Sequence, residues 1–452
     1  MIEHSTEHTF DYILVGGGLQ SGLIVMAVRH HQPNASVLVI EQQRQLAGNH
    51  TWSFHPNDVP ASARPWVTPL IEYQWAGYDV RLNDFRRRLD LAYASISSSY
   101  FAEVITRQFP ARQLVATTHE PNVISMNDRS DGSPSAPVSA DREFDGSCEG
   151  LLLGKTVTAL SKNSVTVDSG EVYCGRLVVD CRGPNHRGPT IFARCGYQKF
   201  WGFEIESEVD WPSLEPTVMD DAVDQTDGFR FIYSLPFERR RILVEDTRFS
   251  NSPALDRSEC YAKVTAYLNT LGIKRWKIIR EESGVLPMPV SSELLPGCID
   301  SHAKDSIAGG YAGGWFHAAT GYSFPLAVAF AETIATSSPD TFSQAIDALA
   351  ARHRSRSQFG RFLNRLLFCL VKPKTRHQIF RRFYSVLSNE AIARFYSHQF
   401  TVKDAAKIVI GVPPRGLRLI QFLKSFFGTT SFDMYKSSTG SPASILRSEK
   451  AS

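Results

Sequence analysis

Asp11-Tyr-Ile-Leu-Val-Gly-Gly-Gly-Leu-Gln-Ser-Gly22 stands near the start of the chain, and Gly309-Gly-Tyr-Ala-Gly-Gly-Trp-Phe-His-Ala-Ala-Thr-Gly-Tyr322 follows nearly 300 residues later. A glycine-rich turn after an apolar strand lets the backbone approach a pyrophosphate and points a helix N-terminus at it. Residues 10–15 predict such a buried parallel strand, and residues 23–31 predict the helix. Two such turns, each opening a helix, suit the two ends of a flavin dinucleotide. The sequence therefore predicts an α/β, Rossmann-like domain that binds FAD.

The first glycine cluster departs slightly from the G-x-G-x-x-G pattern, because its third glycine comes one place late and Ser21 takes the expected position. A small residue there still permits close packing of the helix. A second strand at 35–40 ends at Glu41, which is placed to bind a ribose hydroxyl. The alternative is a glycine-rich turn of another α/β protein. We expect cofactor contacts from Gly16, Gly18, Gly22, Glu41, Gly313, Gly314, Thr320 and Gly321.

Size and composition limit the class of protein. A chain of 452 residues can bury one large or two ordinary cores, and it has no apolar run of the roughly 18 residues that a spanning helix needs. The first predicted strand begins near residue 10, which leaves no room for a signal peptide. Seven cysteines without a C-x-x-C pair favour a reduced compartment and no metal site. We expect a cytoplasmic protein.

Charge is distributed unevenly. Residues 352–424 contain 16 Lys/Arg and two acidic residues, a net +14, so the rest of the chain carries −11 within the total of +3. Basic and apolar residues alternate at 359–371, 379–384 and 417–427, which predicts amphipathic helices against an anionic lipid surface. The alternative is an ordinary solvated basic face. Nucleic acid is not expected as a partner, because no recognition module accompanies the charge.

Composition shifts divide the chain into five regions. Residues 119–150 are rich in Ser, Asp, Pro and Gly and predict a flexible insert, and the end of the chain predicts a disordered tail. The expected regions are an FAD-binding domain at 1–80, 151–200 and 300–340, an inserted β-sheet substrate domain at 81–118 and 201–299, the insert at 119–150, a basic helical membrane-docking region at 341–427, and the tail at 428–452.

Adjacent carboxylates in Arg241-Ile-Leu-Val-Glu-Asp-Thr247 are the candidates for chemistry. Alternation along a strand sends Glu245 and Asp246 to opposite faces, so one of them points inward. A carboxyl in an apolar site has a raised pKa and serves as a general acid near neutral pH. The alternatives are a strand end in solvent or a structural partner for arginines. Glu281 and Glu282 are the rival pair.

Three further patterns concern the substrate region and the flavin. In Gly228-Phe-Arg-Phe-Ile-Tyr-Ser-Leu-Pro236, three aromatic residues share one strand face, as in a binding surface or simply in a sheet core. His50 and His55 are too isolated for a metal site and suit orientation or hydrogen bonding. A helix opened by Pro325, with Ser323 as N-cap, would turn its positive end to the flavin.

Long and unusual strings give the chain a family resemblance from about residue 10 to 415. They are Gly48-Asn-His-Thr-Trp-Ser-Phe-His55, Asp221-Ala-Val-Asp-Gln-Thr-Asp-Gly-Phe-Arg-Phe-Ile-Tyr-Ser-Leu-Pro236, Leu243-Val-Glu-Asp-Thr247, Gly314-Trp-Phe-His-Ala-Ala-Thr-Gly-Tyr-Ser-Phe-Pro-Leu326, Arg382-Phe-Tyr384 and Ile392-Ala-Arg-Phe-Tyr396. The chain resembles the bacterial-type lycopene beta-cyclases, which are FAD-containing carotenoid enzymes. The insert at 119–150 and the tail have no counterpart in that family.

The resemblance implies an isomerase without net redox change, in which the glutamate of the Glu-Asp-Thr string, here Glu245, is the catalytic acid/base. Lycopene and γ-carotene are the implied substrates, reduced FAD stabilises a carbocation, and NAD(P)H keeps the flavin reduced. A C40 hydrocarbon substrate implies a peripheral protein on the cytoplasmic face of a membrane. Two alternative products are an ε-ring, formed when the last proton leaves C4 instead of C6, and a carotenoid with a single ring; the sequence does not decide ring type or ring number. The alternative on the same fold is an FAD/NAD(P)H-dependent monooxygenase or isoprenoid reductase, which would consume NAD(P)H with each turnover.

Overall fold

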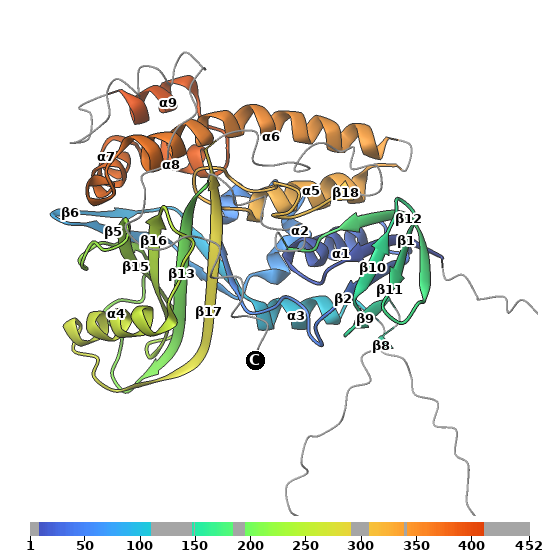
Figure 1. Ribbon diagram of the computed structural model, residues 1–452, viewed down its shortest axis with the longest axis horizontal. Helices are drawn as coiled ribbons and strands as arrows, with labels where there is room; N and C mark the ends of the chain where they lie inside the picture. Colours follow the sequence, from blue (N-terminus) through green and yellow to red (C-terminus); the bar gives the residue numbers. More distant parts are fainter. Residues whose placement is uncertain are drawn as a thin grey trace, which may run out of the picture.

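The computed structural model describes residues 9–109, 147–148, 150–183, 195–290, 307–338 and 341–410. Nearly all of the predicted insert at 119–150, the basic stretch at 417–427 and the predicted tail at 428–452 lie outside these residues. Two sheets stand side by side, and a row of C-terminal helices crosses above them (Figure 1).

The first sheet contains eight strands within the described part of the chain. Its central strands β12, β1, β2 and β9 are parallel neighbours, and β1 ends in four consecutive buried residues, as expected for a strand covered on both faces. Short antiparallel strands extend both edges, and β18 adds to β12. The strands are β1 (Thr9–Val15), β2 (Val37–Glu41), β8 (Ser147–Cys148), β9 (Leu151–Leu153), β10 (Val157–Leu160), β11 (Ser164–Val167), β12 (Val172–Asp180) and β18 (Ile307–Ala308).

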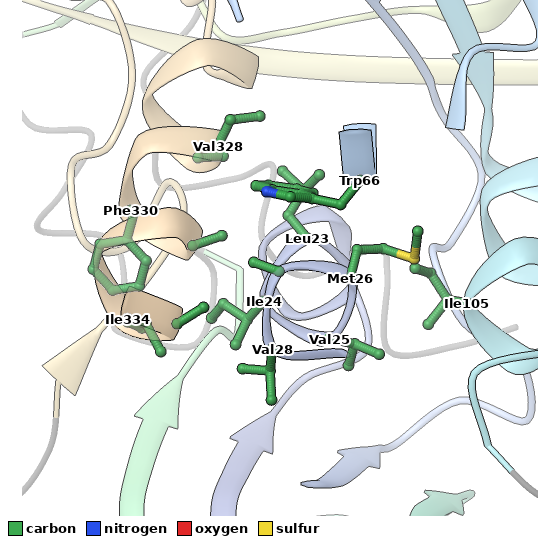
Figure 2. Packing of buried hydrophobic residues seen from close by; sticks show 14 of the residues in the cluster. Leu23, Ile24, Val25, Met26, Val28, Trp66, Ile105, Val328, Phe330 and Ile334 are labelled. Atoms are coloured by element: carbon green, nitrogen blue, oxygen red, sulfur yellow. The ribbon is translucent and has the colours of Figure 1, made fainter. Parts of the chain in front are cut away.

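Helix α1 (Leu19–His31) is the centre of the first hydrophobic core. In Figure 2, its Leu23 lies beside Trp66 of α2 (Arg64–Val67), its Ile24 faces α5 (Phe324–Thr336), and its Met26 lies beside Ile105 of α3 (Ser98–Thr106). The helix is apolar on nearly every side because other elements surround it, as is typical of the first helix of a nucleotide-binding domain.

The second sheet has the order β17-β13-β16-β15-β14-β5-β6 in the described residues. One face packs on α4 (Arg257–Thr270), where Ile232 and Val244 belong to the same apolar cluster as Val264. The opposite face carries Phe231, Leu243 and other residues that meet the C-terminal helices. Its strands are β5 (Tyr78–Leu82), β6 (Phe85–Leu89), β13 (Cys195–Ser207), β14 (Thr217–Asp220), β15 (Phe229–Pro236), β16 (Arg241–Ser250) and β17 (Trp276–Pro289).

A three-stranded sheet of β3 (Thr51–Phe54), β7 (Tyr93–Ser97) and β4 (Tyr73–Trp75) is joined through α3 to the first domain. Residues 94–106, which the predicted boundaries assign to the substrate domain, therefore pack with the nucleotide-binding core. Residues 195–200, assigned to the FAD-binding domain, instead begin β13 of the second sheet. Sequence composition does not reveal these assignments, because β7, α3 and the start of β13 have ordinary compositions and their packing partners are distant in the chain.

The C-terminal helices connect the two sheets. Helix α6 (Phe342–Asn364) runs along the top of the molecule from the first domain to α7 (His377–Val386), α8 (Asn389–Tyr396) and α9 (Val402–Val409), which cover one end of the second sheet (Figure 1). A π-helical turn at Arg365–Leu370 places Phe368 in the core of that sheet. No described helix is both long and apolar enough to cross a bilayer.

Candidate active site

A cavity of about 1800 Å³ extends from the glycine turn after β1 to the inner face of the second sheet. Gly16 and Glu41 line one end, Tyr233 and Glu245 line the inner face of that sheet, and Phe380 of α7 also contributes. Roughly 300–1,000 Å³ is usual for a small-molecule site, so this volume suits a dinucleotide and a large substrate together.

The first glycine turn leaves its backbone open to the cavity. Gly16 has φ of +99°, in the region that favours glycine, and a Cβ there would lie 3.1 Å from the backbone of Arg182. A Cβ on Gly17 would meet Leu46 at 2.5 Å, whereas the space around Gly18 is empty within 4 Å. No side chain caps α1 at its N-terminus. The residues present therefore fit a phosphate group held by backbone N–H groups.

Glu41, at the end of β2, holds this turn in place. Its Oε2 accepts from the N–H of Gly17 at 2.6 Å, and its Oε1 accepts from the N–H of Gln43 at 2.8 Å. Glu41 also lines the cavity, and its contact with a ribose hydroxyl stays a prediction. The turn itself depends on the same carboxylate.

Gly22 does not line the cavity. It faces α3, where a Cβ would lie 2.3 Å from the ring of Phe101. The third glycine of the motif thus allows two helices to approach each other, which is a packing role. Of the predicted front residues, Gly16, Gly18 and Glu41 reach the cavity, and Gly17 is a lining residue that the motif alone does not single out.

The second glycine cluster also divides into two parts. Thr320 and Gly321 line the cavity, as do Gly310 and Tyr311, which were not among the predicted contacts. Gly313 and Gly314 lie behind them: a Cβ on Gly313 would meet the carbonyl of Ala308 at 2.2 Å, and the carbonyl of Gly314 accepts from Nε2 of His353 at 2.8 Å. These two glycines shape the loop and do not line the cavity. The N-terminus of α5 follows, with Ser323 and Phe324 on the cavity wall.

The adjacent carboxylates of β16 face opposite ways, as alternation predicts. Glu245 lines the cavity. Asp246 points to the α4 side and is fully buried, where it accepts from Nε of Arg230 at 2.8 Å and from Nη2 of Arg248 at 2.9 Å. The structural role considered for this pair therefore belongs to Asp246, and Glu245 is the one available for chemistry.

Glu245 meets a second carboxyl across the sheet. Gly202 of β13 pairs with Glu245 of β16 on one side and with Glu282 of β17 on the other, so the three residues form one cross-strand row. A Cβ on Gly202 would lie 2.8 Å from Cγ of Glu245 and 3.2 Å from Cγ of Glu282. The missing side chain makes room for the two carboxyl groups to hydrogen-bond.

The two glutamates have opposite surroundings. Burial and the negative charge of Glu282 raise the pKa of Glu245 well above its usual value. Burial also acts to raise the pKa of Glu282. The positive charges of His50 and Arg280 and the hydrogen bonds with Glu245 and Thr51 outweigh burial and leave that pKa lowered. Nη1 of Arg280 donates to Oε2 of Glu282 at 2.5 Å, and Oγ1 of Thr51 donates to the same oxygen at 2.7 Å. These surroundings favour the protonated form of Glu245 and the ionised form of Glu282.

Glu281 is excluded from this arrangement by its orientation. Its carboxylate forms an ion pair with Arg257 and accepts from Nε1 of Trp201 at 3.1 Å, and it does not line the cavity. Hydrogen bonding to Arg257 lowers its pKa. Glu282, the other predicted rival, is buried behind Glu245 and also does not line the cavity.

Aromatic rings form much of the cavity wall near Glu245. Phe231 and Tyr233 line it, and the hydroxyl of Tyr233 donates to Oγ of Ser53 at 2.8 Å and lies 3.0 Å from that of Tyr93. Three other aromatic residues do not line the cavity: Phe229 stacks on Phe380, Phe316 stacks on Tyr311, and Trp315 packs at a tilt against Phe330.

Both predicted histidines line the cavity. Nδ1 of His55 lies 3.4 Å from Oδ2 of Asp58, and its Nε2 lies 3.3 Å from the hydroxyl of Tyr78. Burial lowers the pKa of His50, which packs on Trp52 and Phe200. Among the described residues, no group of three or more potential metal ligands occurs.

The basic C-terminal stretches contribute to the cavity as well as to the surface. Phe380 and Phe383 of α7 line it, while the apolar end of the 359–371 stretch is buried in the second core. Ordinary packing thus accounts for much of the apolar pattern of these stretches. Exposed apolar residues remain at the ends of α9, where Val402 is 88% and Ile410 is 71% exposed.

The fold is that of flavin-dependent enzymes of the monooxygenase and reductase type. A geranylgeranyl bacteriochlorophyll reductase-like protein from Thermoplasma acidophilum superposes with a TM-score of 0.53 at 11% identity, covering 93% of this chain and 99% of the other. The flavin-dependent brominase Bmp2 gives 0.53 at 13% identity, covering 93% and 98%. At the sequence level, residues 11–149 and 154–421 match the family described as lycopene cyclase protein. The chain belongs to the lycopene cyclase family. A lycopene beta-cyclase from Pseudescherichia vulneris is 34% identical over 89% of this chain and 94% of its own length.

Proposed function

We propose that this protein is a lycopene beta-cyclase that converts the linear ψ end groups of lycopene to β-ionone rings, through γ-carotene to β-carotene. The observation that carries the proposal is Glu245, a buried carboxyl with a raised pKa on the wall of a large cavity rich in aromatic rings. The beta-cyclase relative supports it, since the likeness covers most of both chains.

Glu245 supplies and recovers the proton. Its O–H bond breaks as a C–H bond forms at C2 of the end group, which leaves a tertiary cation at C1. The 5,6 double bond attacks C1 and closes the six-membered ring, moving the cation to C5. Loss of the C6 proton to the Glu245 carboxylate forms the ring double bond and restores the acid. Electrons and protons balance, so the reaction has no net redox change.

The cavity wall protects and stabilises the cation. Phe231 and Tyr233 line the same cavity as Glu245, and a desolvated cation–π contact with an aromatic ring contributes about 2 kcal/mol. Water would trap the cation as an alcohol, so exclusion of water by the surrounding apolar residues is part of the function.

FAD is the proposed cofactor, held by the glycine turn at Gly16–Gly18, by Glu41, and by the loop that contains Thr320 and Gly321. In its reduced form, maintained by NAD(P)H, it supplies negative charge that stabilises the cation. The N-terminus of α5, beginning at Phe324, places its positive dipole end at the cavity wall and favours that negative charge.

A lipid surface is the proposed partner, on the cytoplasmic face of a membrane. The substrate is a bilayer hydrocarbon, and α9 exposes Val402 and Ile410 beside the exposed Lys403 and Lys407. Ile408, between these apolar ends, lines the cavity. Binding of α9 to anionic lipid would therefore bring the cavity wall to the membrane.

The test is anaerobic incubation of the purified protein with lycopene in liposomes, FAD and NADPH, followed by chromatography, with a paired Glu245→Gln run. Wild type should form β-carotene and use NADPH only to reduce the flavin once, and the variant should lose at least roughly 100-fold in rate. Steady NADPH consumption, or no cyclic product, would reject the cyclase in favour of an oxidoreductase. Equal product from both proteins would reject Glu245 as the acid.

A further inference from the structure

Glu282 touches Glu245 but does not line the cavity. It is 3% exposed and lies on β17, behind the row that Gly202 opens. Both of its fixed donors, Arg280 and Thr51, meet the same oxygen, Oε2. That geometry anchors the carboxylate on one side and leaves its remaining acceptor capacity for Glu245.

We propose that Glu282 is a positioning residue that keeps the catalytic proton on Glu245 and aims that carboxyl into the cavity. The inference rests on the cyclase function proposed above. Glu282, ionised throughout, accepts the Glu245 O–H in the resting enzyme. When that O–H bond breaks to form the C2–H bond, the pair carries two negative charges. Their repulsion makes Glu245 a strong base for the C6 proton, whose transfer re-forms the O–H bond.

The other groups around the pair limit which of them can titrate. Arg280 of β17 holds its charge, and it is itself anchored by Nε to Oε2 of Glu204 on β13 at 3.0 Å. His50 faces Glu282: burial lowers the pKa of His50, and the positive charge of its protonated form lowers the pKa of Glu282. Burial raises the pKa of Tyr233 on β15 and of Tyr93 on β7. The proton of the Glu245–Glu282 pair is thus the one that is lost as pH rises from neutral.

The experiment measures the pH dependence of kcat for the full-length protein with reduced FAD. Glu282→Gln removes the negative charge that keeps Glu245 protonated. The high-pH limb of the profile, where kcat falls as Glu245 loses its proton, should therefore move to lower pH, and kcat at neutral pH should fall roughly tenfold. In Thr51→Val the ionised form of Glu282 loses a donor, so the pair holds its proton more tightly and the limb should move to higher pH. An unmoved limb in both variants, with kcat merely lower, would overturn the proposal.

Infrared titration without substrate keeps the inference separate from the cyclase activity. A protonated carboxyl band should be present near neutral pH in wild type, absent in Glu245→Gln, and titrate at lower pH in Glu282→Gln. Were no cyclic product formed while this band behaved as stated, the cyclase proposal would fail and the proton pair would stand. A band unchanged by Glu282→Gln would overturn the positioning role.

Discussion

Glu245 and Glu282 share a hydrogen bond across Gly202, on three adjacent strands of one sheet. Side chains in such a row stand about 5 Å apart, so two carboxyl groups separated by an occupied strand would not meet unless the middle residue lacked a side chain. Gly202, which does not line the cavity, therefore leaves the space in which the two carboxyl groups meet.

Gly202→Ala should disable catalysis while leaving the protein folded. The added Cβ would lie 2.8 Å from Cγ and 3.0 Å from Oε1 of Glu245, so that carboxyl must rotate away from Glu282. We expect kcat to fall at least roughly tenfold, with a stability loss of about 1–3 kcal/mol from overpacking. Steady-state kinetics and urea unfolding measure the two effects. Glu206→Gln, at an exposed position of the same strand, is the matched control. Full activity in Gly202→Ala would contradict the shared-proton arrangement.

Glu245→Gln should stabilise the protein increasingly as pH rises. Burial raises the folded-state pKa of Glu245 above the usual 4.5, so the folded state binds this proton more tightly than the unfolded chain. That contribution is fully present below about pH 4.5 and is lost as pH rises through the raised pKa. Because glutamine has no proton to lose, the difference in Tm between variant and wild type should grow from pH 5 to pH 9. A constant difference across that range would show that Glu245 has no raised pKa. Flavin absorbance should confirm that both proteins remain loaded.

Asp246→Asn should destabilise the protein, unlike Glu245→Gln at the neighbouring position. Asp246 neutralises Arg230 and Arg248, all three of which are buried, and its loss leaves two guanidinium groups short of a partner. Breaking a buried pair costs about 3–5 kcal/mol. Urea unfolding should therefore show a large loss of stability in Asp246→Asn and none in Glu245→Gln near neutral pH. A stable but inactive Asp246→Asn would contradict this assignment, because it would show that the catalytic carboxylate lies on the α4 face of β16 and not on the cavity face.

Val402→Asp with Ile410→Asp should weaken binding to vesicles that contain anionic lipid, because both residues are exposed at the ends of α9. Co-sedimentation should show at least roughly a tenfold weaker association for the double variant, since an interfacial helix binds through its buried apolar area. Activity on lycopene dissolved in detergent should be retained. Lys403→Gln is the companion variant, with a smaller loss that disappears at high salt. Undiminished vesicle binding of the double variant would remove α9 from the docking surface.

Local sequence patterns predicted the elements around the site correctly. The apolar run and glycines near residue 16 indicated β1 and α1, and alternation placed Glu245 and Asp246 on opposite faces of a strand. The chain also belongs to the family that its motifs resemble. These features depend on residues close together in the chain, where steric rules and strand periodicity operate directly.

Local sequence patterns did not predict how elements distant in the chain pack against one another. Leu243 and Val244 are equally apolar neighbours of the carboxylates, so only the positions of α4 and the C-terminal helices determine which face of β16 encloses the cavity. Gly313 and Gly314 resemble cofactor contacts in sequence, yet the folding of their loop buries them behind Gly310.

Gly202 shows the division most clearly. The local sequence predicts a strand there, but its role arises from pairing with β16 and β17, which lie about 40 and 80 residues further along the chain. Residue types and spacing thus specified the cofactor motif, the strand faces and the candidate acid. Only strand pairing brought Glu282 to Glu245. The contacts that shift the pKa of a buried carboxyl come from residues that are adjacent in space and distant in the chain.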